Sequence, residues 1–352
     1  MNKKAKRIVK ILVVVFVCLF AAHQKWPQKT VQWVNSFVRE TESEILAYHD
    51  IFTQLAPHRE PSSQTDAAVS SSDEQKKGEG SVPSNLEVHF IDVGNADSIL
   101  ILCDDEAALI DAGENDCGDL VVDYLQDQGV NKLKYAVGTH PHSDHIGGMD
   151  TVLLNIPTET VLLPAKDHTT KTYKDVLTAI QDTDANLYVP KVGDELRLAE
   201  ATITVLSPDR VWDDLNNNSI VLLLENGEDS FIFAGDAETD AEAVMLDAGI
   251  VPEADVLKVG HHGSNTSTSY RWLWTIMPDY CVIPCGTDNS YGHPHEEVLS
   301  RLSDHSKVNG TTIYRSDENG NIVAYSDGHG NIRFETERNK GWQYNGNSIF
   351  KE

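Results

Sequence analysis

Residues 139–148, THPHSDHIGG, constrain the fold more than any other stretch of this sequence. They place three histidines and one aspartate within six positions, directly after KYAVGT, an apolar run that is typical of a β-strand. Imidazole and carboxylate groups at this density suit Zn²⁺ or Mn²⁺. A metal site here requires a fold that brings further ligands to the end of the same strand. A solvated polar loop is the alternative interpretation.

The order of the residues in this stretch predicts two pairs of side chains. If the chain stays extended beyond the strand, His140 and His142 point to the same side. Asp144 and His145 then lie on the following turn, where a Gly-Gly pair permits an unusual or tight backbone. The two pairs could therefore serve two adjacent metal ions.

Four further polar clusters follow apolar, β-like runs elsewhere in the chain. They are Asp111 after ALI, Asp236 after SFIFAG, His261 and His262 after DVLKVG, and His293 and His295 in YGHPH after YCVIP. Polar groups that follow strands line one rim of a sheet, so we expect these clusters to converge on residues 140–145. The Asp236 carboxylate could bridge two cations there.

From about residue 86 onward, short apolar runs alternate with helical patterns, which indicates an α/β layered domain. Strands are predicted at 86–93, 98–103, 107–112, 134–139, 160–164, 186–190, 201–207, 219–225, 230–235, 254–260, 280–284, 311–316 and 321–326. Helices are predicted near 118–128, 172–182, 238–248, 268–276 and 295–303.

The N-terminal part predicts an attachment to a membrane. Residues 1–25 combine a basic cluster with an apolar run at 11–22, which favours a retained signal-anchor, with a cleaved signal peptide as the alternative. Residues 26–56 have apolar side chains at roughly helical spacing and predict a stalk, and residues 57–85 predict a flexible linker. We expect a single-pass protein of the cell membrane with an extracellular domain, or a secreted protein.

Composition limits the partners of this chain. It carries 28 basic and 55 acidic residues, a net charge of −27, so it has no general attraction for phosphate backbones. Any nucleic acid would have to be held by metal ions or by a local basic patch. Beyond the N-terminal run the cysteines are Cys103, Cys117, Cys281 and Cys285, which predict core thiols or one disulfide. No protein partner is predicted.

With these motifs identified, the segment from about 86 to 335 resembles the metallo-β-lactamase fold, an αββα sandwich with a two-metal site at its edge. HxHxDH carries this resemblance. VHFIDVGNADSILI, LIDAG, FAGD and LKVGHHGSNTS are similar to the hydrolase domain of ComEC-type competence proteins, which accompany DNA-uptake channels. HHGS is also similar to an element of a secreted phosphorylcholine esterase of the same superfamily. The resemblance implies one α/β hydrolase domain over residues 86–352.

The resemblance also implies a role for each motif residue. His140 and His142 would hold a first metal ion, and Asp144 and His145 a second, with Asp144 also counted as catalytic. The remaining roles are Asp236 as the bridging carboxylate, His262 as the last ligand of the second ion with His261 as the alternative, Asp111 as a group that orients a histidine, Ser264 as a holder of substrate oxygens, and His293 as a substrate contact or general acid.

One departure from the family pattern concerns the first ion. Many members supply another histidine between HxHxDH and the bridging aspartate, and here that interval contains His168 alone, in a polar stretch. The corresponding region instead contains Asn218 and Ser219, which resemble an Asn/Ser element of the ComEC-type group. An amide or a water molecule could complete the shell, which predicts weaker binding of the first ion or a preference for Mn²⁺ over Zn²⁺.

Together these features predict a hydrolase with two divalent cations, Zn²⁺ or Mn²⁺, that activate a shared water molecule. We expect a phosphodiester or nucleic-acid-derived substrate and nuclease-like activity related to DNA uptake. The alternatives are hydrolysis of phosphocholine or of another cell-envelope ester, and, in a different class, a degenerate fold that binds without catalysis.

Overall fold

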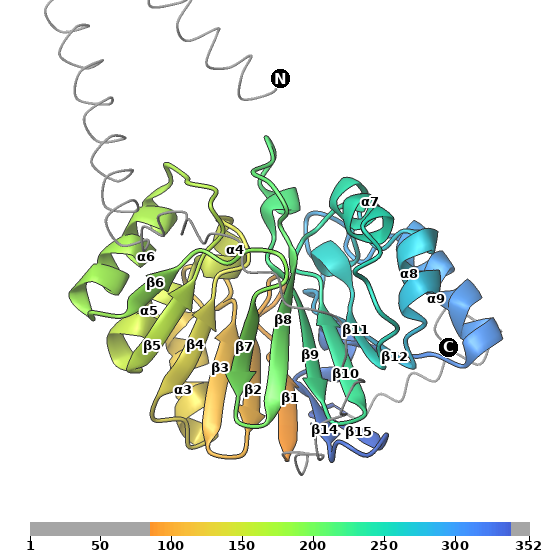
Figure 1. The fold of residues 1–352 in the computed structure, drawn as a ribbon, viewed down its shortest axis with the longest axis horizontal. Coiled ribbons are helices and arrows are strands. Elements are labelled where there is room, and N and C mark those ends of the chain that lie inside the picture. Colours follow the sequence, from red (N-terminus) through yellow and green to blue (C-terminus); the bar gives the residue numbers. More distant parts are fainter. Residues whose placement is uncertain (1–84, 339–352) are drawn as a thin grey trace, which may run out of the picture. The chain divides into compact units, whose positions relative to one another are not determined.

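The computed structural model describes residues 85–338, which form two packed β-sheets with helices on their outer faces (Figure 1). The first sheet has the strand order β15-β14-β1-β2-β3-β4-β5-β6. Its strands are β1 (Leu86–Phe90), β2 (Ile99–Cys103), β3 (Glu106–Ile110), β4 (Leu133–Val137), β5 (Thr158–Leu162), β6 (Asn186–Tyr188), β14 (Ile322–Ser326) and β15 (Ile332–Thr336).

The second sheet has the order β13-β12-β11-β10-β9-β8-β7. Its strands are β7 (Glu195–Leu198), β8 (Ala201–Ser207), β9 (Val221–Asn226), β10 (Asp229–Phe233), β11 (Val256–Lys258), β12 (Tyr280–Ile283) and β13 (Thr312–Arg315). The helices are α3 (Gly118–Asp127), α4 (Ser143–Ile146), α5 (Met149–Asn155), α6 (Lys171–Asp182), α7 (Thr239–Asp247), α8 (Tyr270–Ile276), α9 (Glu296–Asn309) and α10 (Ser316–Asn319), with the 3₁₀ turns η1 (Asn216–Asn218) and η2 (Gly260–Gly263).

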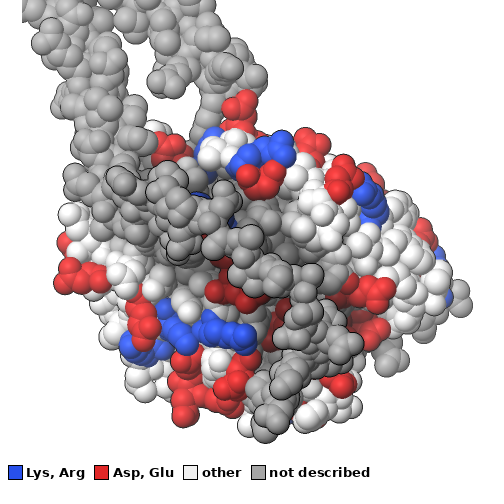
Figure 2. Space-filling model, viewed as in Figure 1, with Lys and Arg blue, Asp and Glu red and all other residues white. Residues whose placement is uncertain are grey.

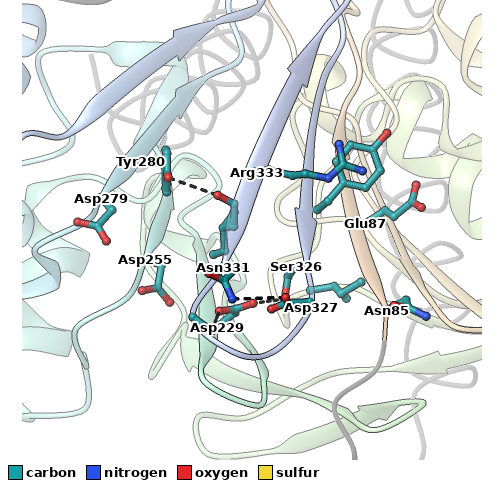
Figure 3. Close-up of a pocket in the computed structure, with 14 residues that line it drawn as sticks. Asn85, Glu87, Asp229, Asp255, Asp279, Tyr280, Ser326, Asp327, Asn331 and Arg333 are labelled. Carbon is teal, nitrogen blue, oxygen red and sulfur yellow. Dashed lines mark hydrogen bonds between the residues drawn. The ribbon is translucent and has the colours of Figure 1, made fainter.

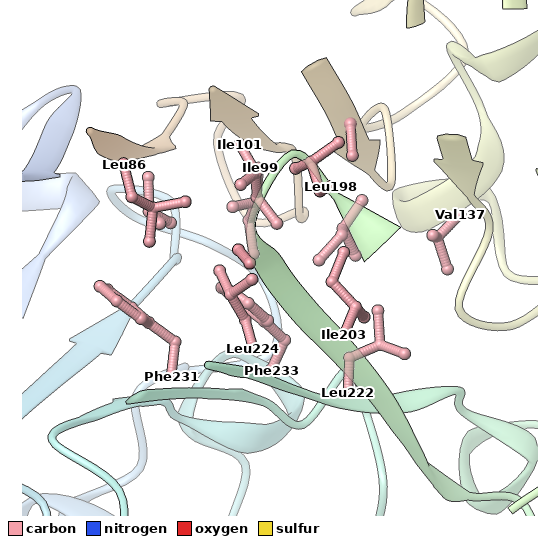
Figure 4. Packing of buried hydrophobic residues seen from close by; sticks show 14 of the residues in the cluster. Leu86, Ile99, Ile101, Val137, Leu198, Ile203, Leu222, Leu224, Phe231 and Phe233 are labelled. Atoms are coloured by element: carbon pink, nitrogen blue, oxygen red, sulfur yellow. The ribbon is translucent and has the colours of Figure 1, made fainter. Parts of the chain in front are cut away.

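The main core lies between the two sheets, where apolar side chains of one sheet face those of the other (Figure 4). Leu86 and Ile101 from the first sheet belong to the same cluster as Leu224, Phe231 and Phe233 from the second. Strands with alternating inward-facing apolar residues bury one face in this way, and the helices cover the other. The predicted αββα sandwich is confirmed for the described residues.

Strand direction determines where the functional loops lie. β3 pairs in parallel with β4 in the first sheet, and β10 pairs in parallel with β11 in the second. The carboxyl ends of these strands meet at one edge of the sandwich, which we call the rim. There the backbone N–H of Ile220 donates to the carbonyl of Thr139 and joins the two sheets. α4 lies at this rim (Figure 1).

The structure adds elements that the sequence patterns did not predict. β7 has mixed polar and apolar residues and lies at the edge of its sheet, where half of its side chains remain exposed. β15 alternates apolar and charged residues at the other sheet's edge. α5 follows α4 closely and is too short to show a helical period. Edge strands bury little apolar surface, and seven residues are too few for a helical repeat to stand out, so both kinds of pattern are weak.

Among residues 85–338, Cys117, Cys281 and Cys285 carry free thiols, and Cys103 is buried. Cys281 and Cys285 are buried, and burial raises the pKa of both thiols, so neither is poised to react. Cys285 donates to Asp317 at 3.3 Å. Core thiols, the first of the two predicted states, therefore describe these cysteines.

The predicted anchor, stalk and linker lie outside the described residues, apart from Asn85. Within residues 85–338, no helix combines the length and the apolar character that a membrane span requires.

Candidate metal centre

Four polar groups from three rim loops form a tight cluster. One ligand atom from each of Asp144, His145, Asp236 and His262 lies within 4.8 Å of the others. Asp144 and His145 come from α4, Asp236 follows β10, and His262 follows β11. The side chains of His145, Asp236 and His262 are at most 1% exposed, and that of Asp144 is 25% exposed. The sandwich therefore brings together groups that are separated by more than a hundred residues.

The Asp236 carboxylate lies at the centre of the cluster. Its Oδ2 lies 3.2 Å from Nε2 of His145, 3.5 Å from Nε2 of His261 and 3.8 Å from Nε2 of His140. Its Oδ1 lies 3.8 Å from Nε2 of His262. Histidines therefore face both carboxylate oxygens, as a carboxylate that bridges two cations requires.

Buried polar atoms without partners test whether this cluster fits a metal ion. Nε2 of His145, Nε2 of His262 and both carboxylate oxygens of Asp236 are buried and have no hydrogen-bond partner among the described residues. Each such atom costs about 1–3 kcal/mol of folding free energy. Imidazole nitrogen and carboxylate oxygen are ligands for a divalent cation, which would satisfy all four atoms together. The residues present fit the group.

The ring orientations support the same assignment. Nδ1 of His145 donates to Asp111 at 2.7 Å, and Nδ1 of His262 lies 3.1 Å from the carbonyl of Pro284. A proton on Nδ1 leaves Nε2 of each ring as an electron-pair donor, and both Nε2 atoms point at Asp236. The opposite ring nitrogens therefore fix the tautomer that metal binding needs.

The electrostatics of the cluster are those of tightly coupled acids and bases. Burial opposes the charge on His145, but Asp236, Asp111 and Asp144 outweigh it and hold the pKa of His145 well above its usual value. Burial likewise opposes the charge on Asp236, but His145 and His262 outweigh it and hold the pKa of that carboxyl well below its usual range. The same balance raises the pKa of His262 to about 9.

His140 and His142 form a second group beside this cluster. Nε2 of His140 lies 2.9 Å from Nδ1 of His142, so the two rings face each other, as the predicted same-side arrangement requires. Burial, with the neighbouring His145, holds the pKa of His140 well below its usual value. Oγ of Ser219 lies 3.4 Å from Nδ1 of His140 and accepts from the backbone N–H of Asp236 at 3.0 Å. Ser219 therefore positions both a histidine and the central carboxylate.

The Gly-Gly pair after α4 provides space rather than an unusual backbone. Gly147 continues with helical dihedral angles, φ −60° and ψ −47°. A Cβ on Gly147 would lie 2.3 Å from the backbone of Asn115 and Ser143, and one on Gly148 would lie 2.4 Å from the carbonyl of Ala112. Glycine here lets α4 pack directly against the loop that follows β3, which carries Asp111.

Consecutive histidines in left-handed conformations bring two rings to the rim. His261 has φ 51° and His262 has φ 52°, a region that non-glycine residues rarely adopt and that costs about 1–3 kcal/mol each. His262 points inward and is buried, whereas the side chain of His261 is 20% exposed. His262 lies 3.3 Å from Oδ2 of Asp144, within the tight cluster. Of the two alternatives for the last ligand, the geometry favours His262.

His261 has its own supporting residues. Its Nδ1 lies 3.3 Å from Oγ1 of Thr266 and 3.6 Å from Oε1 of Glu238. Glu238 in turn accepts from Thr266 and from the amide of Asn216. Ser264 lies 3.0 Å from Oγ1 of Thr266 and so belongs to this network.

Asp111 lies behind the cluster, in the place that the resemblance implied. Besides His145, its carboxylate accepts from the backbone N–H of Thr139 at 2.8 Å and from the hydroxyl of Thr139 at 2.7 Å. Its φ of 59° is left-handed. Asp111 therefore connects the end of β3 to the start of the metal-binding loop and orients His145.

Two buried residues that the sequence reasoning missed lie beneath the cluster. Lys258, 1% exposed, forms an ion pair with Asp97 and donates to the carbonyl of Gly235 at 2.8 Å. Oδ1 of Asp97 lies 3.4 Å from Nδ1 of His262. Burial opposes the charge on Asp97, but Lys258 and His262 outweigh it and lower the pKa of this carboxyl. The available signal was a single lysine inside the apolar strand run DVLKVG.

The structure also places Asn218, His168 and His293, which differ in how close they lie to the cluster. The side chain of Asn218 accepts from the backbone N–H of Trp212 at 3.0 Å and donates to Asp214, so its amide holds a loop instead of facing the metal-binding groups. His168 lies beside Thr170 at the start of α6. His293 lies close to the rim: its ring centroid is 5.5 Å from that of His261 and 6.1 Å from that of His262.

The surroundings of His293 bear on its predicted role. Burial, together with the neighbouring His262 and His261, lowers the pKa of His293 to about 4. With this pKa the ring is a neutral imidazole at physiological pH, and its remaining N–H is a poor general acid. Of the two predicted roles, substrate contact is the one this environment favours.

Comparisons with known proteins agree with this geometry. The family model described as the Metallo-beta-lactamase superfamily matches residues 91–276. ComE operon protein 3 of Bacillus subtilis is 31% identical over 257 residues, which cover 66% of this chain and 33% of that protein. Recombination protein 2 of Haemophilus influenzae is 31% identical over 222 residues, covering 61% and 26%. Competence protein ComA of Neisseria gonorrhoeae is 28% identical over 240 residues, covering 67% and 32%. The chain thus spans about a third or less of these relatives.

Proposed function

Because the chain belongs to the metallo-β-lactamase superfamily, we propose that the rim is the active site of a metal-dependent hydrolase that cleaves a phosphodiester. The observation that carries this proposal is the convergence of buried, unpartnered donor atoms from His145, His262 and Asp236. Such a cluster destabilises a folded protein unless a cation satisfies it, and folded proteins keep such strain at functional sites.

Asp144, His145, Asp236 and His262 would hold the second ion, and His140 and His142 would hold the first together with Asp236. When bound, divalent cations in such a site supply a water of near-neutral pKa and stabilise negative charge on phosphoryl oxygens. The native metal, Zn²⁺ or Mn²⁺, belongs to the proposal, because both ions accept nitrogen and carboxylate ligands.

The protein's own residues then have distinct tasks. Asp111 keeps the proton of His145 on Nδ1, and Asp97, together with the carbonyl of Pro284, holds Nδ1 of His262. Lys258 offsets the negative charge that the buried carboxylates bring together. These groups do not reach the reacting atoms and act by positioning the ligands.

His261 is the residue that we assign to the substrate. Its partial exposure lets a substrate reach the ring, and Glu238 and Thr266 hold Nδ1 from behind, which leaves Nε2 facing the rim. Hydrolysis forms a bond from water oxygen to phosphorus and breaks one P–O ester bond. In its imidazolium form His261 would donate from Nδ1 to Glu238 and from Nε2 to a phosphoryl oxygen as negative charge develops there.

A phosphodiester from nucleic acid is the substrate class that we favour. Three observations support it: the resemblance of the HHGS and FAGD elements to ComEC-type domains, and the names of two relatives, a competence protein and a recombination protein. Because the chain spans only a part of those proteins, a role in DNA uptake is a proposal for this chain.

Surface charge argues for a single strand or a small phosphodiester over a long duplex. Acidic side chains are spread over the described atoms visible in Figure 2, and the basic ones lie in small groups beside them. Lys132 pairs with Glu159, and Lys134 with Glu106, so both of these lysines are neutralised by a neighbouring carboxylate. Duplex binding depends on many unpaired cations along the backbone track.

For location, we propose that the domain works outside the cytoplasm, attached through residues 1–25 or secreted after their removal. The support is the basic cluster followed by the apolar run in the sequence.

Turnover of bis-(p-nitrophenyl) phosphate by the full chain tests the hydrolase directly. We expect metal-dependent release of p-nitrophenolate that Asp144→Ala and His262→Ala abolish, while the control His168→Ala retains it. A p-nitrophenyl phosphorylcholine arm distinguishes the phosphocholine alternative. Absence of bound metal in the intact protein, or turnover that both changes leave intact, would refute the enzyme and leave a binding module.

A further inference from the structure

We propose that Tyr291 and His293 form a stacking platform for a nucleobase next to the scissile phosphodiester. This inference rests on the proposed function and narrows its substrate to nucleotides. It assigns a role to Tyr291, which none of the predicted metal or catalytic roles uses.

The rings of Tyr291, His293 and His262 form a stacked series, here called the ladder, that runs from solvent to the metal centre. Tyr291 is 69% exposed, and its ring is nearly parallel to that of His293, with centroids 5.6 Å apart and an interplanar angle of 19°. The His293 ring in turn lies 6.1 Å from that of His262 at 26°. A flat group laid on Tyr291 would therefore lie about three ring spacings from His262, with the rings of Tyr291 and His293 between them.

The loop that carries the platform is held in place. Oδ1 of Asn289 accepts from the backbone N–H of Tyr291 at 3.2 Å and from that of His293 at 2.9 Å, while its amide donates to Gly286 at 2.8 Å. At the far end, the backbone N–H of His295 donates to Gly263 at 2.9 Å. The exposed ring is thus presented at low entropic cost to a ligand.

Contact between this loop and the metal-binding loop is unusually close. Gly263 has a φ of 81°, and a Cβ there would lie 2.5 Å from Cβ of Pro294. Nδ1 of His295 also accepts from the backbone N–H of Asn265 at 3.0 Å. The HHGS element and the platform therefore form one rigid surface, which relates a base on Tyr291 to a phosphate at the metal centre.

An unpartnered buried atom points independently to a ligand. His293 is 9% exposed, and its Nδ1 has no hydrogen-bond partner among the described residues. Among the described residues, the ring of His293 packs against the rings of Tyr291, His261, His262 and His295. A nucleotide bound across the ladder would supply the missing polar partner.

The geometry favours a nucleobase over a quaternary ammonium group. Choline is bound in cages, in which several rings surround the cation from different directions. Tyr291 and His293 are nearly parallel and present one flat exposed face. A planar base matches such a face, and base-on-aromatic stacking tolerates any base because every base has a π-face.

Two phosphodiesters with the same leaving group test the platform. Thymidine 5′-(p-nitrophenyl phosphate) carries a base, and ethyl p-nitrophenyl phosphate does not. We expect Tyr291→Ala to raise KM for the thymidine ester roughly 5- to 150-fold more than KM for the ethyl ester, the range that the loss of one base stack gives. Tyr291→Phe should restore the wild-type ratio, because it keeps the ring.

Tyr270→Ala provides the matched control, because Tyr270 is another exposed tyrosine, on α8. It should leave the ratio of the two KM values unchanged. Equal effects of Tyr291→Ala on both esters would overturn the platform while the hydrolase stands. A selective loss of p-nitrophenyl phosphorylcholine turnover would also overturn it and would make Tyr291 a choline contact.

A binding measurement keeps the test independent of turnover. Fluorescence anisotropy with the full chain compares a labelled thymidine tetranucleotide with an abasic strand of equal length. The thymidine strand should bind roughly 5- to 150-fold more tightly, and Tyr291→Ala, but not Tyr291→Phe, should remove the difference. Base-dependent binding without any hydrolysis would refute the proposed function alone. Equal binding of both strands would refute the platform.

Discussion

Opposite the rim, at the amino ends of β10, β11 and β12, the structure has a second acidic region. A cavity of about 700 Å³ is lined there by Asp229, Asp255 and Asp279, among others (Figure 3). Both edges of the sandwich thus gather carboxylates, and one of the distal ones, Asp229, is as buried as Asp236 at the rim. A buried aspartate among other carboxylates therefore does not by itself separate the two regions, although only the rim adds histidines.

Hydrogen bonding does separate them. Oδ2 of Asp229 accepts from the hydroxyl of Ser326, which lies beside it in Figure 3. It also accepts from the backbone N–H of Gly328 at 2.9 Å, and Oδ1 accepts from that of Gly330 at 2.8 Å. Asp229 is a structural residue that ties β10 to the turn after β14. The oxygens of Asp236 have no such partners. Unsatisfied buried groups, rather than a cavity or an acidic cluster, identify the site.

The strongest test of this contrast removes a ligand from the rim. His262→Ala should abolish binding of the second ion and lower turnover by more than the roughly 100-fold that the loss of an outer partner causes. Metal analysis of the purified variant, with circular dichroism to verify folding, measures this. Unchanged metal content would place the ligand elsewhere.

His261→Ala should behave differently from its neighbour. Because His261 is assigned to the substrate, we expect full metal content and a kcat lower by roughly 10²- to 10³-fold, the effect of losing one donor to a developing oxyanion. Metal content and steady-state kinetics on the same preparation decide the question. Loss of one ion per chain would instead make His261 the histidine that the first site otherwise lacks.

Asp97→Asn should weaken both the site and the fold. We expect metal affinity to fall roughly 10- to 100-fold, because Nδ1 of His262 loses a carboxylate partner. The change also leaves the ammonium of Lys258 buried without its counter-ion, which should cost about 3–5 kcal/mol of unfolding free energy.

The double variant Asp97→Asn/Lys258→Met separates these effects. Removing the buried cation should recover most of the stability measured by urea unfolding, while metal affinity stays low. Recovery of metal affinity together with stability would show that Asp97 has no positioning role.

Asp229→Asn should show the smallest functional effect. The change weakens a charged acceptor of three hydrogen bonds, so we expect a loss of about 1–3 kcal/mol in unfolding free energy. Metal content and turnover should match the wild type, since the residue lies at the opposite edge. A drop in metal content in a folded Asp229→Asn protein would break the contrast between the two regions.

Much of the site could be predicted because its ligands follow strands. Runs such as SFIFAG and DVLKVG predict a buried strand. The polar residue that follows such a strand must lie where the strand ends, at one rim of the sheet. That logic placed Asp111, Asp236 and the histidine pair at one rim with His140 and His145. Linear order could not separate His261 from His262, because the left-handed backbone that turns one inward and one outward is a property of the fold.

The missed residues have a shared physical reason. Lys258 lies inside an apolar strand, and Asp97 lies in a turn. Their role comes from the ion pair that they form with each other between the two sheets. Asn218 was expected near the first ion because it resembles an Asn/Ser element of the ComEC-type group, and in the structure its amide bonds to the loop around Trp212. Ion pairs between the two sheets, and hydrogen bonds that a side chain makes to its own loop, cannot be predicted from any single stretch of sequence.

Metal content of the full-length chain tests the central claim most directly. The protein is stripped with a chelator, reloaded separately with Zn²⁺ and Mn²⁺, dialysed, and analysed by mass spectrometry of the elements, alongside Asp236→Asn and Asp229→Asn. We predict two ions per chain for the wild type and for Asp229→Asn, and a loss of bound metal in Asp236→Asn. A wild-type protein that retains no ion, or an Asp236→Asn protein that retains as much as the wild type, would contradict the account.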